Sequence, residues 1–202
     1  MKLSSGFLAT IEKENEGSSS ADNYLRYTKL DQGKPANFAL LEQDPLEYWL
    51  VWGVAKENDS MKPFRFLEQP DQSDIDLELG SDYVQSMNYD KTAVRKPSQC
   101  LTWPVYNWEA KKVQVLECGH VSTRTGMESI LTHKTWKKMP TDIDIEITKT
   151  VTSDNRTTYE VMPSPRDDSH DADEAEAAYK AIKKEGFDLN RMVVGGDPFS
   201  EG

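Results

Sequence analysis

The hydrophobic pattern along the chain is that of a series of short strands. Over residues 143–147 isoleucine alternates with polar residues, and a turn at residues 154–155 leads to a second apolar segment over residues 157–162. Strict alternation of this kind is typical of a strand with one buried face, so these segments predict a β-hairpin. Residues 100–106 and 112–118 predict another hairpin of the same kind.

Three more strands are predicted nearer the N-terminus. Residues 24–30 and 37–41 flank a Gly-containing turn and predict a hairpin, and residues 46–54 follow as a third strand. The third strand is apolar on both faces, with Trp49 on one face and Trp52 on the other. Such a strand is either covered on both sides or keeps one face for a ligand.

One helix is predicted between the central and the final hairpin. Thr125 and Glu128 have the spacing of a capping box, and Met127, Ile130 and Leu131 form an apolar helical stripe. Strands followed by a helix and a last hairpin are compatible with a Greek-key barrel of the OB type. We therefore predict a mainly β fold, an OB-like Greek-key barrel with one interposed helix and a C-terminal helical, acidic tail. Other small barrels and sandwiches would have a similar periodicity.

Changes in composition divide the chain into three parts. Residues 1–23 are polar and rich in serine, which predicts a flexible N-terminal segment. Residues 24–165 form the predicted OB-like domain, in which residues 56–91 form an acidic, irregular insertion. Residues 166–202 form the acidic tail, with a short helix that Asp171 would cap.

The acidic charge is concentrated towards the two ends. The formal net charge is -11, with 10 basic and 17 acidic residues over 1–95, 9 and 8 over 96–165, and 5 and 10 over 166–202. Phosphate binding needs lysine and arginine, so a uniformly acidic chain would argue against nucleic acid. The near-neutral middle permits a local basic groove beside acidic segments.

The sequence predicts an intracellular protein. No segment approaches the roughly 20 apolar residues that a membrane-spanning helix needs, and no signal peptide is predicted. The two cysteines, Cys100 and Cys118, do not form a disulfide-scaffold composition, and a reducing compartment is the default for such a chain.

Aromatic and basic residues occur together in the predicted strands and turns. Proteins hold single-stranded nucleic acid by a positive groove along the phosphates and by aromatic rings that stack on the bases. Each stack contributes about 1–3 kcal/mol. The predicted stacking residues are Tyr27, Trp49, Trp52, Tyr106 and Trp108. The predicted cationic contacts are Arg26, Lys29, Lys96, Lys111, Lys112 and Arg124.

The same rings have an ordinary structural interpretation, because aromatic residues are usually core residues. Trp103 shares a face with apolar neighbours and is expected in the core, and Trp136, late in the predicted helix, is expected to pack rather than bind. Tyr106 and Trp108 stand near a turn, where we expect them to be exposed.

The last residues of the tail predict a docking peptide. The run of acids is followed by an apolar helical face and then by Asp197, Pro198 and Phe199, an acidic segment with an exposed ring. We expect this peptide to bind a protein partner, and the tail to occupy a basic groove when DNA is absent.

Catalysis and metal binding find little support. Asp142, Asp144 and Glu146 share a strand face and would be the ligands of a Mg²⁺-dependent nuclease, but such alternation is more often a solvated surface. Cys118 and His120 lack the spacing of a zinc knuckle. The chain has no phosphate-binding loop and no catalytic serine motif, so we predict no enzyme, no cofactor and no metal.

Several short pieces resemble a family of phage single-stranded DNA-binding proteins. They are KPSQC at 96–100, PVYN at 104–107, VQVLE at 113–117, DIDI at 142–145, YEV at 159–161 and GGDPF at 195–199. The resemblance implies an OB fold, coating of unpaired DNA during phage replication or recombination, and a C-terminal tail that contacts replication enzymes. Some phage proteins of this function carry zinc in a compact Cys/His cluster, which this sequence lacks.

The resulting hypothesis is a non-enzymatic protein that protects single-stranded DNA in the cytoplasm of an infected bacterial host and recruits replication or recombination proteins through its tail. One alternative is a phage transcription factor that holds melted promoter DNA. Another is an acidic adaptor or inhibitor that mimics DNA and binds only protein. The oligomeric state and the size of the DNA site do not follow from the sequence.

Overall fold

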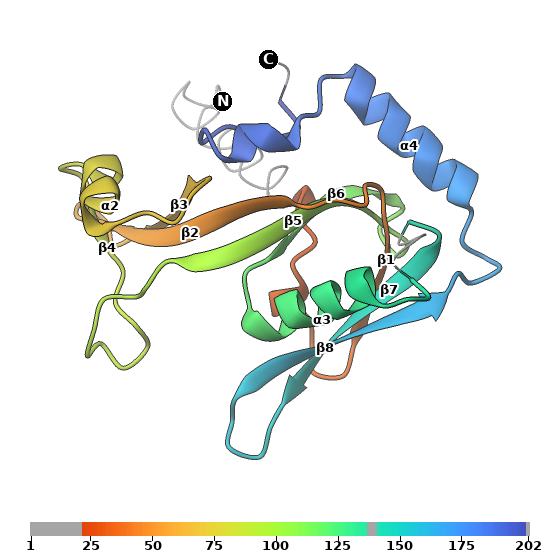
Figure 1. Cartoon of the computed structure of the whole chain (residues 1–202), viewed down its shortest axis with the longest axis horizontal. Coiled ribbons are helices and arrows are strands. Elements are labelled where there is room, and N and C mark those ends of the chain that lie inside the picture. Colours follow the sequence, from red (N-terminus) through yellow and green to blue (C-terminus); the bar gives the residue numbers. More distant parts are fainter. Residues whose placement is uncertain (1–21, 137–140, 201–202) are drawn as a thin grey trace, which may run out of the picture.

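The computed structural model describes residues 22–136 and 141–200 (Figure 1). These residues form a mainly β fold, with eight antiparallel strands in one open sheet and three helices. The elements are β1 (Pro35–Leu40), β2 (Leu46–Ala55), β3 (Met61–Phe66), α2 (Gln72–Leu79), β4 (Tyr83–Gln85), β5 (Ser98–Asn107), β6 (Lys112–Cys118), α3 (Val121–Thr132), β7 (Ile143–Val151), β8 (Thr157–Pro165) and α4 (Ala172–Lys184). None of the described helices is long and apolar enough to cross a bilayer. The predicted flexible segment 1–23 lies almost wholly outside the described residues.

The sheet runs in the order β3-β2-β5-β1-β7-β8, with β4 added to β2 and β6 added to β5. Two of the three predicted hairpins are confirmed, as β5–β6 and β7–β8. β1 joins them, because it pairs with β5 on one side and with β7 on the other. Since β6 and β8 do not pair within the described residues, the sheet is not closed, and a closed OB-like barrel is not confirmed.

The main core lies on the side of this sheet that α3 covers. Trp103 and Val105 of β5, Leu116 of β6, and Ile145 and Ile147 of β7 all have no exposed side-chain surface. Alternation along each strand brings them to the same face. The predictions that Trp103 is a core residue and that β7 has one buried face are therefore confirmed.

The gap between β6 and β8 is filled by the segment before β1. This segment was predicted as a strand, but it forms a short 3₁₀ helix, Tyr27–Lys29. The ring of Tyr27 enters the gap, where it packs edge-on against Tyr159 of β8 with centroids 4.9 Å apart, and its hydroxyl lies 3.2 Å from Thr123 Oγ1 on α3. The polar neighbours of Tyr27 stay exposed to solvent. The turn therefore buries the ring without burying these polar side chains.

The helix α3 begins four residues earlier than the predicted capping box. His120 is the N-cap, and its Nδ1 accepts a hydrogen bond from the backbone N–H of Ser122. The predicted apolar stripe is confirmed, because Met127 and Ile130 pack into the main core. Trp136, beyond the helix, is half-buried against the same core, in keeping with the packing role predicted for it.

Gly126 allows α3 to lie directly on β8. A Cβ at this position would come within 2.6 Å of Val161 Cβ. Overpacking typically costs about 1–3 kcal/mol, and the better helix propensity of alanine offsets about 1 kcal/mol of that. We expect Gly126→Ala to lower the free energy of unfolding by up to about 2 kcal/mol in urea titrations. Gly119→Ala is the control, since its Cβ would meet only Cys100 Sγ at 3.9 Å; equal losses would contradict the close packing.

The insertion predicted as irregular is an ordered arm. β3, α2 and β4 extend from the far end of β2, away from the main core (Figure 1). The arm has a small core of its own, made by Val51, Phe64, Ile75 and Leu79. Its helix starts with a complete capping box between Asp71 and Asp74, a signal that the irregular, acidic interpretation missed.

Candidate nucleic-acid interface

The second face of β5 and β6 carries the side chains that point away from the main core. Thr102, Pro104 and Tyr106 of β5 stand directly opposite Glu117, Val115 and Val113 of β6. The two strands form a hairpin immediately before α3.

Residues 172–199, which we call the C-terminal cover, lie across this face. Figure 1 shows α4 and the chain after it on the side of β6 opposite to α3. Ala175 packs with Tyr106 and Val113, and beyond α4 the side chains of Phe187 and Met192 pack on Val115. Ala178, Tyr179, Ile182, Leu189 and Phe199 complete the contact. The cover therefore buries the apolar surface of the β5–β6 hairpin.

The predicted tail helix is confirmed in detail. Asp171 is the N-cap of α4 and accepts hydrogen bonds from the backbone N–H groups of Asp173 and Glu174. Gly186 follows the helix with a φ of 98°, a left-handed conformation that favours glycine at a helix end.

The prediction that the acidic tail occupies a basic groove is wrong for the described residues. The contact is apolar, and its polar margin is formed by acids on both sides: the Tyr106 hydroxyl donates to Glu174, and the Tyr179 hydroxyl donates to Glu42. Burial and the bond to Glu174 raise the pKa of Tyr106 to about 12. Tyr106 thus stays a neutral hydrogen-bond donor at neutral pH.

The predicted docking peptide, residues 197–199, is folded back on the preceding part of the cover. Pro198 is buried, and Phe199 is half-buried with its ring centroid 4.9 Å from that of Phe187. The backbone N–H of Asp188 donates to Pro198 O at 3.0 Å, and Asp197 accepts from the N–H of Phe199. The expectation of an exposed ring at Phe199 is therefore wrong.

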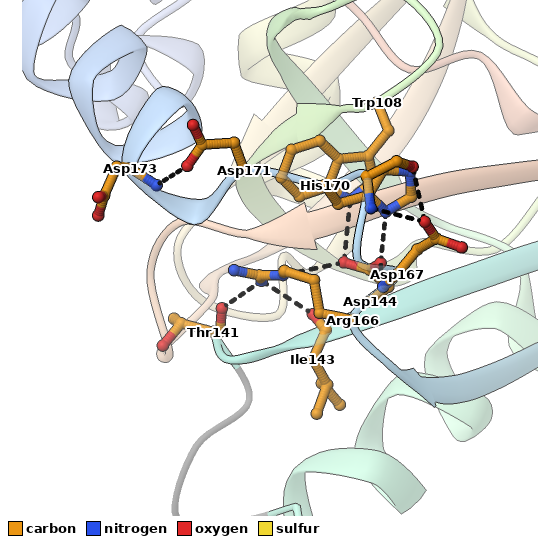
Figure 2. A network of polar contacts seen from close by, with 10 residues as sticks. Trp108, Thr141, Ile143, Asp144, Arg166, Asp167, His170, Asp171 and Asp173 are labelled. Carbon is orange, nitrogen blue, oxygen red and sulfur yellow. Dashed lines mark hydrogen bonds and ion pairs between the residues drawn. The ribbon is translucent and has the colours of Figure 1, made fainter.

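A buried carboxylate anchors the chain where the cover begins (Figure 2). Asp144 of β7 accepts from Trp108 Nε1 at 3.0 Å, from Arg166 Nε at 3.2 Å and from the backbone N–H of Asp167 at 3.2 Å, and its Oδ2 lies 2.6 Å from His170 Nδ1. The His170 ring stacks on Trp108, with centroids 4.4 Å apart and planes at 5°. Four donors on one carboxylate explain its burial.

Asp144 was predicted on a solvated strand face. That prediction is wrong, because its carboxylate is buried and accepts the hydrogen bonds of this anchor. Asp142 is exposed, and the Glu146 carboxylate accepts a hydrogen bond from Thr148. Among the described residues no cluster of histidine, cysteine and acidic side chains could hold a metal ion. Both cysteines are free and buried, and burial raises the pKa of Cys100 to about 12, far from that of a reactive thiolate.

The predicted stacking residues fall into two groups. Tyr27, Tyr106 and Trp108 are 3%, 1% and 9% exposed, so the expectation that the last two are exposed at the turn is wrong. Trp108 turns inward because its indole N–H reaches Asp144, and Tyr106 lies under α4. Trp49 and Trp52 are half-buried on opposite faces of β2, and Trp52 packs against the same buried cluster as Val193 of the cover.

The predicted cations do not form one groove. Lys96 precedes β5, and Arg124 donates to Gln99 near the start of that strand at 3.4 Å. Lys111 and Lys112 lie at the other end of the same hairpin, about 30 Å away at 3.3 Å per residue, and Lys112 pairs with Asp22. Exposed Arg26 is instead the N-cap of the 3₁₀ helix, and exposed Lys29 is its last residue.

The sequence analysis overlooked Tyr89, the most exposed large hydrophobic side chain among the described residues. It stands between Asn88 and Asp90 in the loop from β4 to β5, with Lys91 next along the chain. An aromatic residue among turn-forming residues and a cation is a visible signal, but the segment was absorbed into the acidic insertion.

No protein-family model, curated protein or solved structure matches this chain.

Proposed function

We propose that this protein binds single-stranded DNA without catalysis, through an OB-like arrangement of five of its strands. The supporting observation is the order β1, β5, β6, α3, β7, β8, in which β1 pairs with both β5 and β7 and one helix separates the third strand from the fourth. An OB fold is a five-stranded, partly open Greek-key barrel, and its second and third strands bind oligonucleotides. The corresponding strands here are β5 and β6.

In this proposal the DNA-binding face is the one beneath the C-terminal cover. Tyr106 and the apolar side chains of β6 supply a stacking surface once the cover leaves, and Trp52 extends it onto β2. Cations at the two ends of the β5–β6 hairpin, Lys96 and Lys111, are exposed and suited to phosphates at the entry and exit of the strand. Bare ring faces let a protein of net charge -11 bind a polyanion.

Release of the cover also gives the tail its role. Asp197, Pro198 and Phe199 are held against Phe187 in the covered state. Displacement by DNA frees them to bind a second protein, which for a phage protein of this kind is a replication or recombination enzyme. DNA binding and partner recruitment are thereby coupled through one segment, because each favours the uncovered state.

A second candidate is favoured by the burial of the predicted rings. A protein that presents acids to solvent and keeps Tyr106 and Trp108 covered fits an acidic adaptor that binds only another protein. The two candidates differ in whether the cover is displaced by DNA.

The experiment is a titration of the full chain with oligothymidine, followed by intrinsic tryptophan fluorescence. Because Trp52 and Val193 of the cover pack against the same buried cluster, displacement of the cover should change the emission of Trp52 in a saturable way. Duplex DNA of the same length is the control and should bind more weakly. A flat response with oligothymidine would leave the protein-only adaptor, whereas preference for one strand sequence over homopolymers would favour the promoter-holding factor.

A further inference from the structure

The loop between β4 and β5, residues 86–97, has a rigid tip. The Asn88 side-chain oxygen accepts from the backbone N–H groups of Thr92 and Ala93 at 3.0 and 3.2 Å. The Asn88 backbone N–H donates to Ala93 O at 2.9 Å. The Asp90 carboxylate accepts from both the backbone N–H and the hydroxyl of Thr92. These bonds fix the backbone of the tip without help from any other element.

The fixed tip presents a bare aromatic ring. Tyr89 is 105% exposed, and its immediate surroundings include Met87 and Val94, which pair across the base of the tip and are about half exposed. In Figure 1 the loop extends below β4, away from both α3 and α4. Large apolar side chains held outward on an ordered loop are typical of a binding site.

The loop is also locally basic in an acidic protein. Lys91, Arg95 and Lys96 are exposed, and Asp90 is the single acid between residues 86 and 97. No carboxylate in the described part of the chain forms an ion pair with any of these three cations. Their charges are therefore available to an anion.

We propose that this loop is a nucleic-acid contact in which Tyr89 stacks on an unpaired base and Arg95 and Lys96 bind the flanking phosphates. The inference rests on the proposed function and adds to it a site that stays open while the C-terminal cover is in place. The loop joins β4 to β5, so a strand held here leads directly onto the β5–β6 face. The loop makes the first contact, and binding then extends under the cover.

The chemistry favours single-stranded nucleic acid over a protein partner. A protein-binding loop of this kind would bury its apolar side chains against a matching surface, and unpaired cations at such a contact would be costly to desolvate. A base stacked on Tyr89 uses the ring alone, and phosphates neutralise Arg95 and Lys96 in the same step. Because the tip is preorganised, binding loses little conformational entropy.

The test compares Tyr89→Ala with Tyr89→Phe in the full chain, with anisotropy of labelled oligothymidine as the readout. Loss of one stacked base should weaken affinity about 5- to 150-fold in Tyr89→Ala, whereas Tyr89→Phe should stay within about twofold of the wild type. Leu77→Ala is the matched control, because Leu77 is another exposed apolar side chain of the arm, on α2, at 83% exposure. It should bind as the wild type does.

A second variant isolates the phosphate contacts. Arg95→Ala combined with Lys96→Ala should make the negative slope of log affinity against log salt shallower by about 1.4, at about 0.7 per lost contact to a single strand. Wild-type affinity in Tyr89→Ala, with oligothymidine still bound, would overturn the loop site and leave the proposed function standing. Absence of binding by the wild-type chain would overturn both the loop site and the proposed function. If Tyr89→Ala lost only the binding of a protein partner, the loop site alone would be overturned.

Discussion

Replacing Phe187 and Met192 with alanine should tighten the binding of oligothymidine by about tenfold or more. The two side chains are 5% and 1% exposed and pack on Val115 of β6, so they hold the C-terminal cover on the proposed DNA face. Truncating a buried methionine or phenylalanine typically costs about 2–5 kcal/mol. In this segment much of that cost falls on docking of the cover rather than on the main core.

The gain follows from a population shift. If DNA binds only the uncovered state, its apparent affinity equals the intrinsic affinity multiplied by the fraction of molecules that are uncovered. Weaker docking raises this fraction until the cover is mostly open, which sets the upper limit of the effect. Because the contact is apolar, the gain should be nearly the same at low and high salt, in contrast to the expectation for a tail held by charge.

Val194→Ala is the matched control for this prediction, because Val194 belongs to the same segment and is 84% exposed. It should leave the affinity for oligothymidine unchanged. Equal affinities for the control and the double variant, with the double variant still folded by circular dichroism, would mean that the cover does not compete with DNA.

Asp144→Asn should lower the free energy of unfolding by about 3–5 kcal/mol, measured by urea denaturation. Removing one partner of a buried ion pair leaves the other charge uncompensated, which typically costs that much. The Asp144 side chain is 4% exposed, and the Arg166 and His170 side chains are 17% and 22% exposed. The amide that replaces the carboxylate also presents two N–H donors to a site that already holds Trp108 Nε1–H.

Asp142→Asn, two residues earlier on the chain, is the control, since Asp142 is exposed. A surface change of this kind should stay within about 0.5 kcal/mol of the wild type. If both variants lost the same stability, the anchor would contribute nothing specific. The Asp144 variant should also become sensitive to proteases near residues 166–171, because Arg166 and His170 lose their common acceptor.

The hairpins of the fold were predictable because they depend on local alternation. Ile143, Ile145 and Ile147 face one core, and the strands β5–β8 follow from patterns of this kind. The gap-filling turn at Tyr27 was not predictable, since the sequence around it has the same alternation as a strand and only the missing pairing between β6 and β8 decides its conformation. Closure of a sheet is a property of distant edges, which no local pattern contains.

The candidate site was predicted less well, because exposure depends on what covers a surface. Tyr106 stands near a turn in the sequence, and its burial is caused by α4, about seventy residues later. Asp144 has the pattern of a solvated face, and only the return of Arg166 and His170 makes it an anchor. Contacts from segments distant in the sequence therefore decide which aromatic rings are exposed to a nucleic-acid base.

Hydrogen exchange with and without bound oligothymidine tests the central claim most directly. If DNA binds the β5–β6 face by displacing the cover, the backbone amides of α4 and of residues 187–193 should exchange faster in the complex than in the free protein. Unchanged or slower exchange over these residues at saturating oligothymidine would contradict the account.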